Sequence, residues 1–255
     1  MEEYNMKLIK IVLCSLMAAL PATANAEDIQ DPFYRPQTGH FLSETGFSFA
    51  KAKLDFGVLK LKPEQKILSE QLTYGITSGL FAEATFANSW VDLKSDMFEK
   101  YESRYWDAGL AYRMAPAQNT TLTIGAYYTE NRDEGQDREN TVEAKVLLEL
   151  MKDQTLKPFA AVAYERDTEY FSKSHDNYNF EAGLWAKADK ISVKTAVSYV
   201  YNHHDTVSST YIDVEADCAL AENIAVGAGF SSLLHEHNTL LTSQTTYGAQ
   251  LKLVF

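Results

Sequence analysis

The sequence predicts an all-β protein whose antiparallel strands close into an up-and-down transmembrane β-barrel. Three observations lead to this prediction. Apolar and polar residues alternate with a period of two between Phe41 and Phe255. The connections between the alternating runs are short and long in turn. The chain also ends inside an alternating run, because Phe255 is its last residue.

The first 26 residues have the pattern of a secretory signal peptide. Lys7 and Lys10 form a short basic region, residues 11–20 form an apolar core, and residues 24–26 (Ala-Asn-Ala) supply a small-x-small cleavage site. An apolar core of this length is too short to span roughly 30 Å of hydrocarbon. We therefore expect residues 1–26 to be removed by cleavage.

Residues 27–40 form a leader between the signal peptide and the barrel domain of residues 41–255. The leader contains Pro32 and Pro36 and shows no clear period. It is expected on the periplasmic side, either as a tail outside the barrel or as a small plug in its mouth. The sequence favours the tail.

About 12 candidate strands can be marked in the barrel domain. They cover residues 41–56, 66–77, 80–90, 103–114, 120–130, 141–150, 155–165, 177–188, 190–201, 210–220, 223–233 and 245–255. Most are close to 11 residues long. At about 3.3 Å per residue and a tilt near 45°, such a strand rises roughly 25 Å, which matches the apolar band of a membrane barrel.

Two kinds of connection alternate along the chain. The short ones are residues 77–79, 115–119, 151–154, 189–190 and 221–223. The longer polar ones are residues 57–65, 91–102, 131–140, 166–176, 202–209 and 234–244. Bacterial outer-membrane barrels have short turns in the periplasm and longer loops outside. An even number of strands then places both ends of the barrel in the periplasm.

The last strand resembles that of Gram-negative outer-membrane β-barrel proteins, which typically ends in Phe. Tyr247, Leu251, Leu253 and Phe255 share one face of it. Residues 72–80 (Leu-Thr-Tyr-Gly-Ile-Thr-Ser-Gly-Leu) resemble a strand–turn–strand phrase common in these barrels. The resemblance implies a porin-like protein in the cell outer membrane, among lipid and lipopolysaccharide. It also implies that the barrel-assembly machinery reads the last strand as an assembly signal.

The alternation also predicts which residues face the lumen. Asp213, Glu215 and Asp217 share one face of their strand, and Ile212 and Val214 lie on the other. The predicted lumen set has nine acidic and six basic residues. It consists of Glu83, Asp107, Arg113, Glu143, Lys145, Glu149, Lys157, Glu165, Glu181, Lys187, Lys194, Asp213, Glu215, Asp217 and Lys252. Lys194 is the expected partner of the acidic row on residues 213–217.

Composition excludes several classes of protein. The net charge is −12, which disfavours nucleic acid as a partner because phosphate binding needs clustered Lys and Arg. Only Cys218 remains after cleavage, so no intramolecular disulfide can form. No run after residue 26 has 18 consecutive apolar residues, which excludes an α-helical membrane protein.

Catalytic and metal sites have only weak signals. Histidines lie in or beside predicted loops at His175, His203, His204, His235 and His237, without the spacing of a known metal site. Exposed polar residues explain them better, and no cofactor is expected. Ser208 or Ser209 near His203 and His204 could form a nucleophile–base pair of a lipid-modifying enzyme. No established catalytic motif accompanies them, so no catalytic residue is predicted.

The sequence therefore favours a passive channel for small hydrophilic solutes, with a mild cation preference from the acidic surplus of its lumen. A barrel of about 12 strands lies between small barrels filled by side chains and large open ones. The alternatives are a structural or adhesion barrel with a filled lumen and, less favoured, an outer-membrane lipid-modifying enzyme.

Overall fold

A computed structural model describes residues 29–57, 60–94, 100–133, 138–150, 155–168, 175–203, 205–237 and 240–255. The expected signal peptide, His204 and the side chain of His175 lie outside the described residues. No helix in these ranges is long and apolar enough to cross a membrane.

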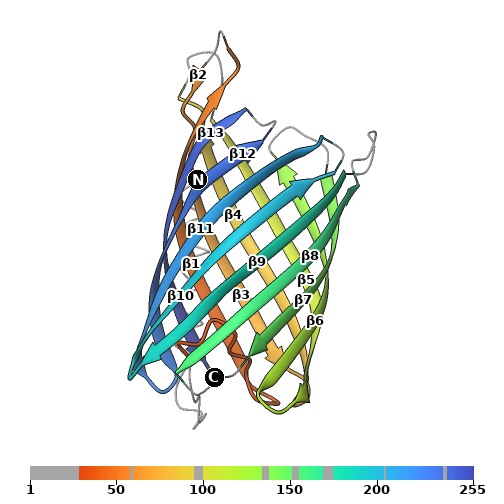
Figure 1. The fold of residues 1–255 in the computed structure, drawn as a ribbon, viewed down its shortest axis with the longest axis vertical. Helices are drawn as coiled ribbons and strands as arrows, with labels where there is room; N and C mark the ends of the chain where they lie inside the picture. Colours follow the sequence, from red (N-terminus) through yellow and green to blue (C-terminus); the bar gives the residue numbers. More distant parts are fainter. Residues whose placement is uncertain are drawn as a thin grey trace, which may run out of the picture.

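The described chain forms one closed antiparallel barrel of 12 long strands, with a two-residue strand that pairs with the end of the first one (Figure 1). The strands are β1 (Phe41–Asp55), β2 (Lys60–Leu61), β3 (Glu64–Gly75), β4 (Leu80–Asp92), β5 (Tyr101–Ala117), β6 (Thr120–Asp133), β7 (Arg138–Leu150), β8 (Leu156–Thr168), β9 (His175–Ala188), β10 (Ile191–Asn202), β11 (Val207–Ala221), β12 (Ile224–His237) and β13 (Leu241–Val254). Each of the predicted strands is present, and β2 is an addition.

The barrel closes where β1 pairs with β13. The pairing register runs from Leu42 opposite Val254 to Leu54 opposite Leu241. At its end the N–H of Phe41 donates to the carbonyl of Phe255 at 2.7 Å, and the N–H of Phe255 donates back at 3.0 Å. Closure leaves no unpaired strand edge, which a bilayer could not satisfy with hydrogen bonds.

The two faces of the wall differ as the alternation predicts. Large apolar side chains are exposed on the outside, including Phe86, Leu110, Val142 and Ile191. Residues of opposite parity point inward, where Glu83, Ser192, Asp217 and Lys252 are buried. An apolar outer face and a polar inner face are what a barrel in lipid requires.

The turns at one end of the barrel are tight. The turn between β5 and β6 places Asn119 at φ 65°, and the turn between β9 and β10 places Asp189 at φ 53°. Asn and Asp tolerate this left-handed conformation better than most residues.

At the opposite end the strands continue further than predicted. β6 reaches Asp133 and β7 begins at Arg138, inside the predicted loop 131–140. The expected loop 166–176 is shortened in the same way by β8 and β9. Above the membrane both faces of a hairpin meet water, so the alternation fades while the backbone pairing continues. The predicted loop boundaries were wrong for this reason.

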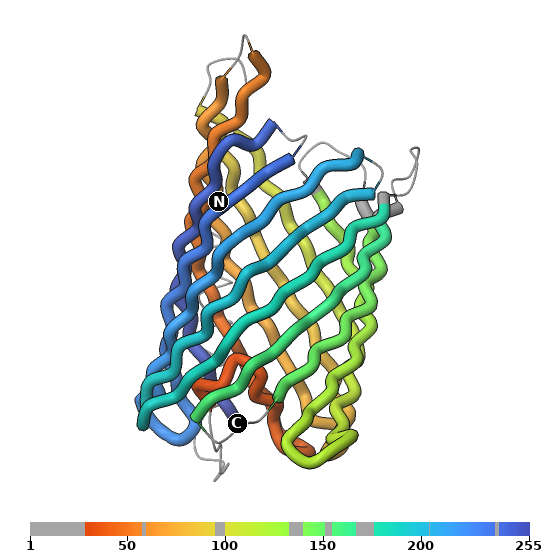
Figure 2. The backbone as a smooth tube through the Cα atoms, in the orientation of Figure 1, coloured from red at the N-terminus to blue at the C-terminus, as the bar shows by residue number. Residues whose placement is uncertain are grey.

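The leader packs inside the barrel, and the expectation of a tail outside it was wrong. Ile29, Gln30, Asp31, Phe33 and Pro36 are all buried. Figure 2 shows this segment in red, crossing the lumen at the end where the chain terminates. The sequence gives no periodic signal for this packing, because it depends on individual contacts with distant strands.

Gly75 explains how the leader approaches the wall. The N–H of Gly39 donates to the carbonyl of Gly75 at 2.8 Å, and the N–H of Gly75 donates to the carbonyl of His40 at 3.1 Å. A Cβ at Gly75 would lie 2.3 Å from the carbonyl oxygen of Gln37. Only glycine allows this backbone contact.

Candidate functional site: the barrel lumen

The leader is held in the lumen by two ion pairs. Lys157 of β8 contacts the carboxylate of Asp31, and both side chains are buried. Arg35 lies with its Nε atom 3.0 Å from Oε1 of Glu83 on β4. Because one pair reaches β8 and the other reaches β4, the leader is attached to the wall at two separate places.

A third charged contact lies beside them. The guanidinium of Arg113 on β5 donates to both carboxylate oxygens of Glu149 on β7, at 3.1 and 3.2 Å. It also donates to the carbonyl oxygen of Phe33 at 3.3 Å. Glu149 is fully buried, so Arg113 compensates a charge that would otherwise be costly inside the barrel.

Phe33 inserts into an apolar cluster on the inner wall. The cluster contains Phe33, Leu147, Phe159, Ala161, Trp185 and Ala196. The Phe33 and Phe159 rings are 4.8 Å apart between centroids. The ammonium of Lys157 lies 4.8 Å from the ring of Trp185, a cation–π contact. This end of the lumen is therefore packed like a protein core.

Lys252 is the centre of a separate charged network. Its ammonium lies 3.0 Å from Asp217, 3.6 Å from Glu215 and 3.7 Å from Glu44. Gln250, two residues earlier on β13, donates to both Glu215 and Asp217. The network joins β1, β11 and β13 across the closing seam.

Lys194 has an ion-pair partner outside the predicted acidic row. The register places it opposite Glu215. Its ammonium nevertheless lies 2.8 Å from Glu181 on β9, and it also faces the ring of Phe159 at 5.2 Å. The acidic row of β11 is compensated mainly by Lys252.

Beyond the leader, the lumen holds two cavities whose lining contains more acidic than basic residues. Asp107 accepts the backbone N–H of Thr85 at 3.1 Å, and Asp213 accepts the hydroxyl of Ser198 at 2.7 Å. Among the residues described, neither carboxylate belongs to an ion pair. Asp107 lines one cavity of about 400 Å³ and Asp213 lines another of about 400 Å³. These carboxylates leave a negative charge facing the open space.

The remaining predicted lumen residues also face inward. Glu143, Lys145 and Glu181 line both of the cavities. Glu165 accepts a hydrogen bond from the amide of Asn179 at 3.4 Å. Lys187 is opposite Ser192 in the register, near the turn end. The inner face thus holds each residue of the predicted set.

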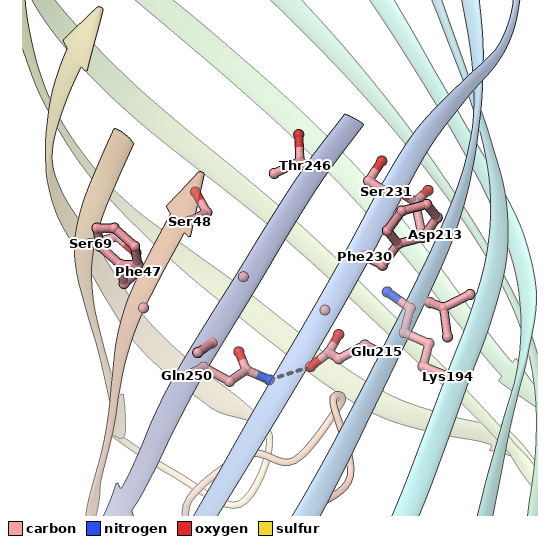
Figure 3. A pocket seen from close by; sticks show the side chains of 15 residues that line it. Phe47, Ser48, Ser69, Lys194, Asp213, Glu215, Phe230, Ser231, Thr246 and Gln250 are labelled. Carbon is pink, nitrogen blue, oxygen red and sulfur yellow. Dashed lines mark hydrogen bonds between the residues drawn. The ribbon is translucent and has the colours of Figure 1, made fainter. Parts of the chain in front are cut away.

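A recess of about 300 Å³ opens from the lumen onto the wall formed by β1, β12 and β13 (Figure 3). Asp213 and Glu215 lie on one side of it, and Ser48 and Ser69 lie on the other. Gly229 and Gly248 form part of its floor.

Among the lumen residues of the described chain, the predicted set lacks several that make charged or hydrogen-bonded contacts, including Asp31, Arg35, Glu44, Tyr127 and Gln250. The first two lie in the aperiodic leader, which was expected outside. Glu44 and Tyr127 have the inward parity of their strands, so the alternation of the sequence could have predicted that they face the lumen. Tyr127 donates its hydroxyl to Glu83 at 2.6 Å.

The predicted assembly signal lies in β13 and just after it. Tyr247 is exposed on the outer face. Leu251 and Leu253 have the same parity, but Leu253 is buried. The Phe255 ring stacks on Phe41 at 5.7 Å between centroids. These four residues are therefore part of the closing seam.

The histidine and serine candidates lie away from the cavities. Ser208 is opposite His237 in the β11–β12 register, and Ser209 is opposite Glu236. In the described ranges no three His, Cys, Asp or Glu side chains are grouped as metal ligands would be.

Comparison with known proteins finds matches in structure alone. No family model matches the chain, and no curated protein matches its sequence. The COG4313 outer membrane channel from Pseudomonas putida F1 is similar with a TM-score of 0.71 and 12% identity, covering 88% of this chain and 98% of that one.

Two further structures are similar at lower scores. The NanC porin has a TM-score of 0.58 and 7% identity, covering 83% of this chain and 98% of its own. The translocator domain of the autotransporter NalP from Neisseria meningitidis has a TM-score of 0.54 and 8% identity, covering 98% and 95%. The chain has the fold of outer-membrane β-barrels, shared by porins and autotransporter barrels.

Proposed function

We propose that this protein is a porin-like passive channel of the outer membrane, for small hydrophilic solutes and with a mild preference for cations. The supporting observation is the acidic surplus around the two cavities of the lumen, which Lys145 and Lys194 also line. There, Asp107 and Asp213 face cavities of about 400 Å³ each without a basic partner in the described chain. Carboxylates lining a water-filled passage raise the local concentration of cations.

The orientation follows from the turns. The tight turns lie at the end that the leader occupies, and short turns face the periplasm in outer-membrane barrels. The leader then fills the periplasmic mouth, and the acidic part of the lumen opens outward. Lipid and lipopolysaccharide surround the apolar wall, and the seam that ends at Phe255 is the part that the barrel-assembly machinery reads.

The channel proposal is tested by ion selectivity in planar bilayers. We expect discrete current steps and a reversal potential that favours K⁺ over Cl⁻ in a KCl gradient. Asp107→Asn combined with Asp213→Asn removes both unpaired carboxylates, so the reversal potential should move toward zero. Glu222→Gln, at an exposed turn outside the lumen, is the matched control and should leave it unchanged. Absence of current steps would reject the channel.

A second candidate is a structural barrel with a filled lumen and no transport. The observation that favours it is the packing of Phe33 and its apolar cluster across one end of the barrel. The same bilayer experiment separates the two functions, because a filled barrel gives no current. Neither proposal assigns an enzymatic role.

A further inference from the structure

The glycines of the inner wall fall into two groups. Most are covered by a neighbouring group. A Cβ at Gly109 or Gly125 would lie 2.3 or 2.6 Å from the ring of Tyr127, and one at Gly183 would lie 2.7 Å from the ring of Phe159. These glycines make room for an aromatic side chain of the protein itself.

Gly229 and Gly248 are different, because nothing covers them. A Cβ at Gly229 would have its nearest neighbour at 3.8 Å, and one at Gly248 would have it at 3.6 Å. The two residues are paired directly across β12 and β13. The register is regular there, so neither glycine marks a bulge. A glycine inside a strand that serves no bulge often marks a close approach by a ligand.

The register neighbours of the two glycines on β11 and β1 are polar, and the apolar residues Phe47, Val214, Phe230 and Ala249 also line the recess. In the register, Glu215 of β11 lies beside Gly229, and Ser48 of β1 lies beside Gly248. One pleat closer to the loops, Ser231 and Thr246 are paired with each other. The backbone of the two glycines is therefore bordered by the Glu215 carboxylate on the β11 side, by the Ser48 hydroxyl on the β1 side, and by the hydroxyls of Ser231 and Thr246 toward the loops.

Four hydroxyl groups of this recess are available to a ligand. They belong to Ser48, Ser69, Ser231 and Thr246. Within the part of the chain that the structure describes, none of them hydrogen-bonds to another residue. A hydroxyl can donate one hydrogen bond and accept two, and a carboxylate such as Glu215 has about four acceptor positions.

We propose that this recess binds one ring of a neutral sugar during its passage, which deepens the proposed channel function and rests on it. Neighbouring strands are about 4.8 Å apart, so the Gly229–Gly248 pair offers a flat floor for the C–H face of such a ring. The hydroxyl groups match a solute that both donates and accepts hydrogen bonds. The volume, about 300 Å³, lies at the lower end of small-molecule sites.

Charge selects against acidic sugars. Asp213 and Glu215 both line the recess, and the only basic side chain there is Lys194, which is paired with Glu181. Figure 3 shows the two carboxylates on the same side as Lys194. A uronic acid would bring a further negative charge to this wall, so its binding should be weaker than that of the neutral sugar.

The test measures block of the single-channel current by glucose, with glucuronate as the anionic comparison. Glucose should reduce the current in a saturable way at concentrations where glucuronate does not. Gly248→Val fills the floor without a backbone clash, because the nearest atom to its Cβ is 3.6 Å away. It should raise the half-blocking concentration about tenfold or more.

Thr246→Val should raise the half-blocking concentration roughly fivefold, through loss of one hydrogen bond. The matched control is Thr245→Val, next to it on the same strand and on the opposite face, and it should change nothing. If Gly248→Val fails to fold, Thr246→Val combined with Ser231→Ala carries the same test. The proposal is overturned if glucose leaves the wild-type current unchanged, or if Gly248→Val does not alter the block.

Calorimetric titration of glucose into the detergent-solubilised protein separates the two proposals. Binding that Thr246→Val weakens, in a protein without current steps, would reject the channel and retain the sugar site. Current steps without glucose binding would retain the channel and reject the site.

Discussion

The two ends of the lumen are built from the same strands but have opposite character. At the turn end, Phe33 packs on Phe159, and Lys157 is paired with Asp31. Beyond the leader, Asp107 and Asp213 face open space. The leader causes the difference, because it brings the ring of Phe33 and the carboxylate of Asp31 to one end only. The number of strands alone therefore does not determine whether the lumen of a barrel of this size is filled or open.

Removal of the leader is expected to have the largest effect on the difference between the two ends of the lumen. Deletion of residues 29–36 from the chain should widen the turn end and raise the single-channel conductance several-fold. The physical reason is that these residues occupy the mouth with buried side chains. Heat-modifiable gel mobility would verify that the barrel still forms. An unchanged conductance would mean that the narrowest point lies elsewhere.

A smaller effect is expected when the leader loses one anchor. Lys157→Met leaves the buried carboxylate of Asp31 without its cation, a change that typically costs about 3–5 kcal/mol. The leader should then detach and become accessible to protease added at the turn end. Mass spectrometry of the cleaved N-terminus measures this.

Two further variants show whether the Lys157–Asp31 ion pair is what holds the leader in the lumen. Lys190→Met, at an exposed turn, should leave the leader protected. Asp31→Asn together with Lys157→Met removes both charges and should restore most of the protection. If the double variant is cleaved as readily as Lys157→Met, apolar packing rather than charge determines the position of the leader.

The smallest expected effect is the loss, at low pH, of the contacts of Asp92 at the loop end of the barrel, beyond the membrane. Asp92 accepts the backbone N–H of Lys94 at 2.9 Å and lies 3.1 Å from the ammonium groups of Lys94 and Lys100. The backbone N–H of Lys94, followed by these lysines, lowers the pKa of Asp92 from 3.8 to about 2. The stabilisation of this loop is therefore complete above about pH 4 and is lost as the pH falls through about 2.

Amide hydrogen exchange of Lys94 measures this loss directly. Its protection should fall between pH 4 and pH 2, after correction for intrinsic exchange, and Asp92→Asn should abolish the change. The amide of Asp205 is a suitable internal control, because it donates to the side-chain oxygen of Asn202, which does not titrate. A parallel fall at Asp205 would point to general unfolding instead.

The period of two was sufficient to predict the wall. It located each long strand and gave the inward direction of residues as far apart as Glu83 and Lys252. This works because the pleat alternates rigidly, so one buried face determines the parity of a whole strand. Near the loops both faces are wet, and the prediction of strand ends failed there.

The interactions across the lumen could not be predicted in the same way. The pair Arg113–Glu149 joins two strands that are not neighbours in the barrel, and the pair Lys252–Glu44 joins its first and last strands. Parity says that both partners point inward, but their relative height depends on the stagger of the closed barrel. The leader has neither parity nor period, so its packing against Phe159 had no local signal.

The asymmetry of the lumen has an electrical consequence. A passage that is constricted and charge-paired at one end, and wider and acidic at the other, accumulates mobile cations unequally under opposite voltages. In the proposed channel this asymmetry would produce partial rectification, so that the current–voltage curve would bend in one direction. The leader, a few residues folded back into the mouth, would then give the membrane a one-sided resistance, and the sign of that curvature would report which way each molecule had inserted.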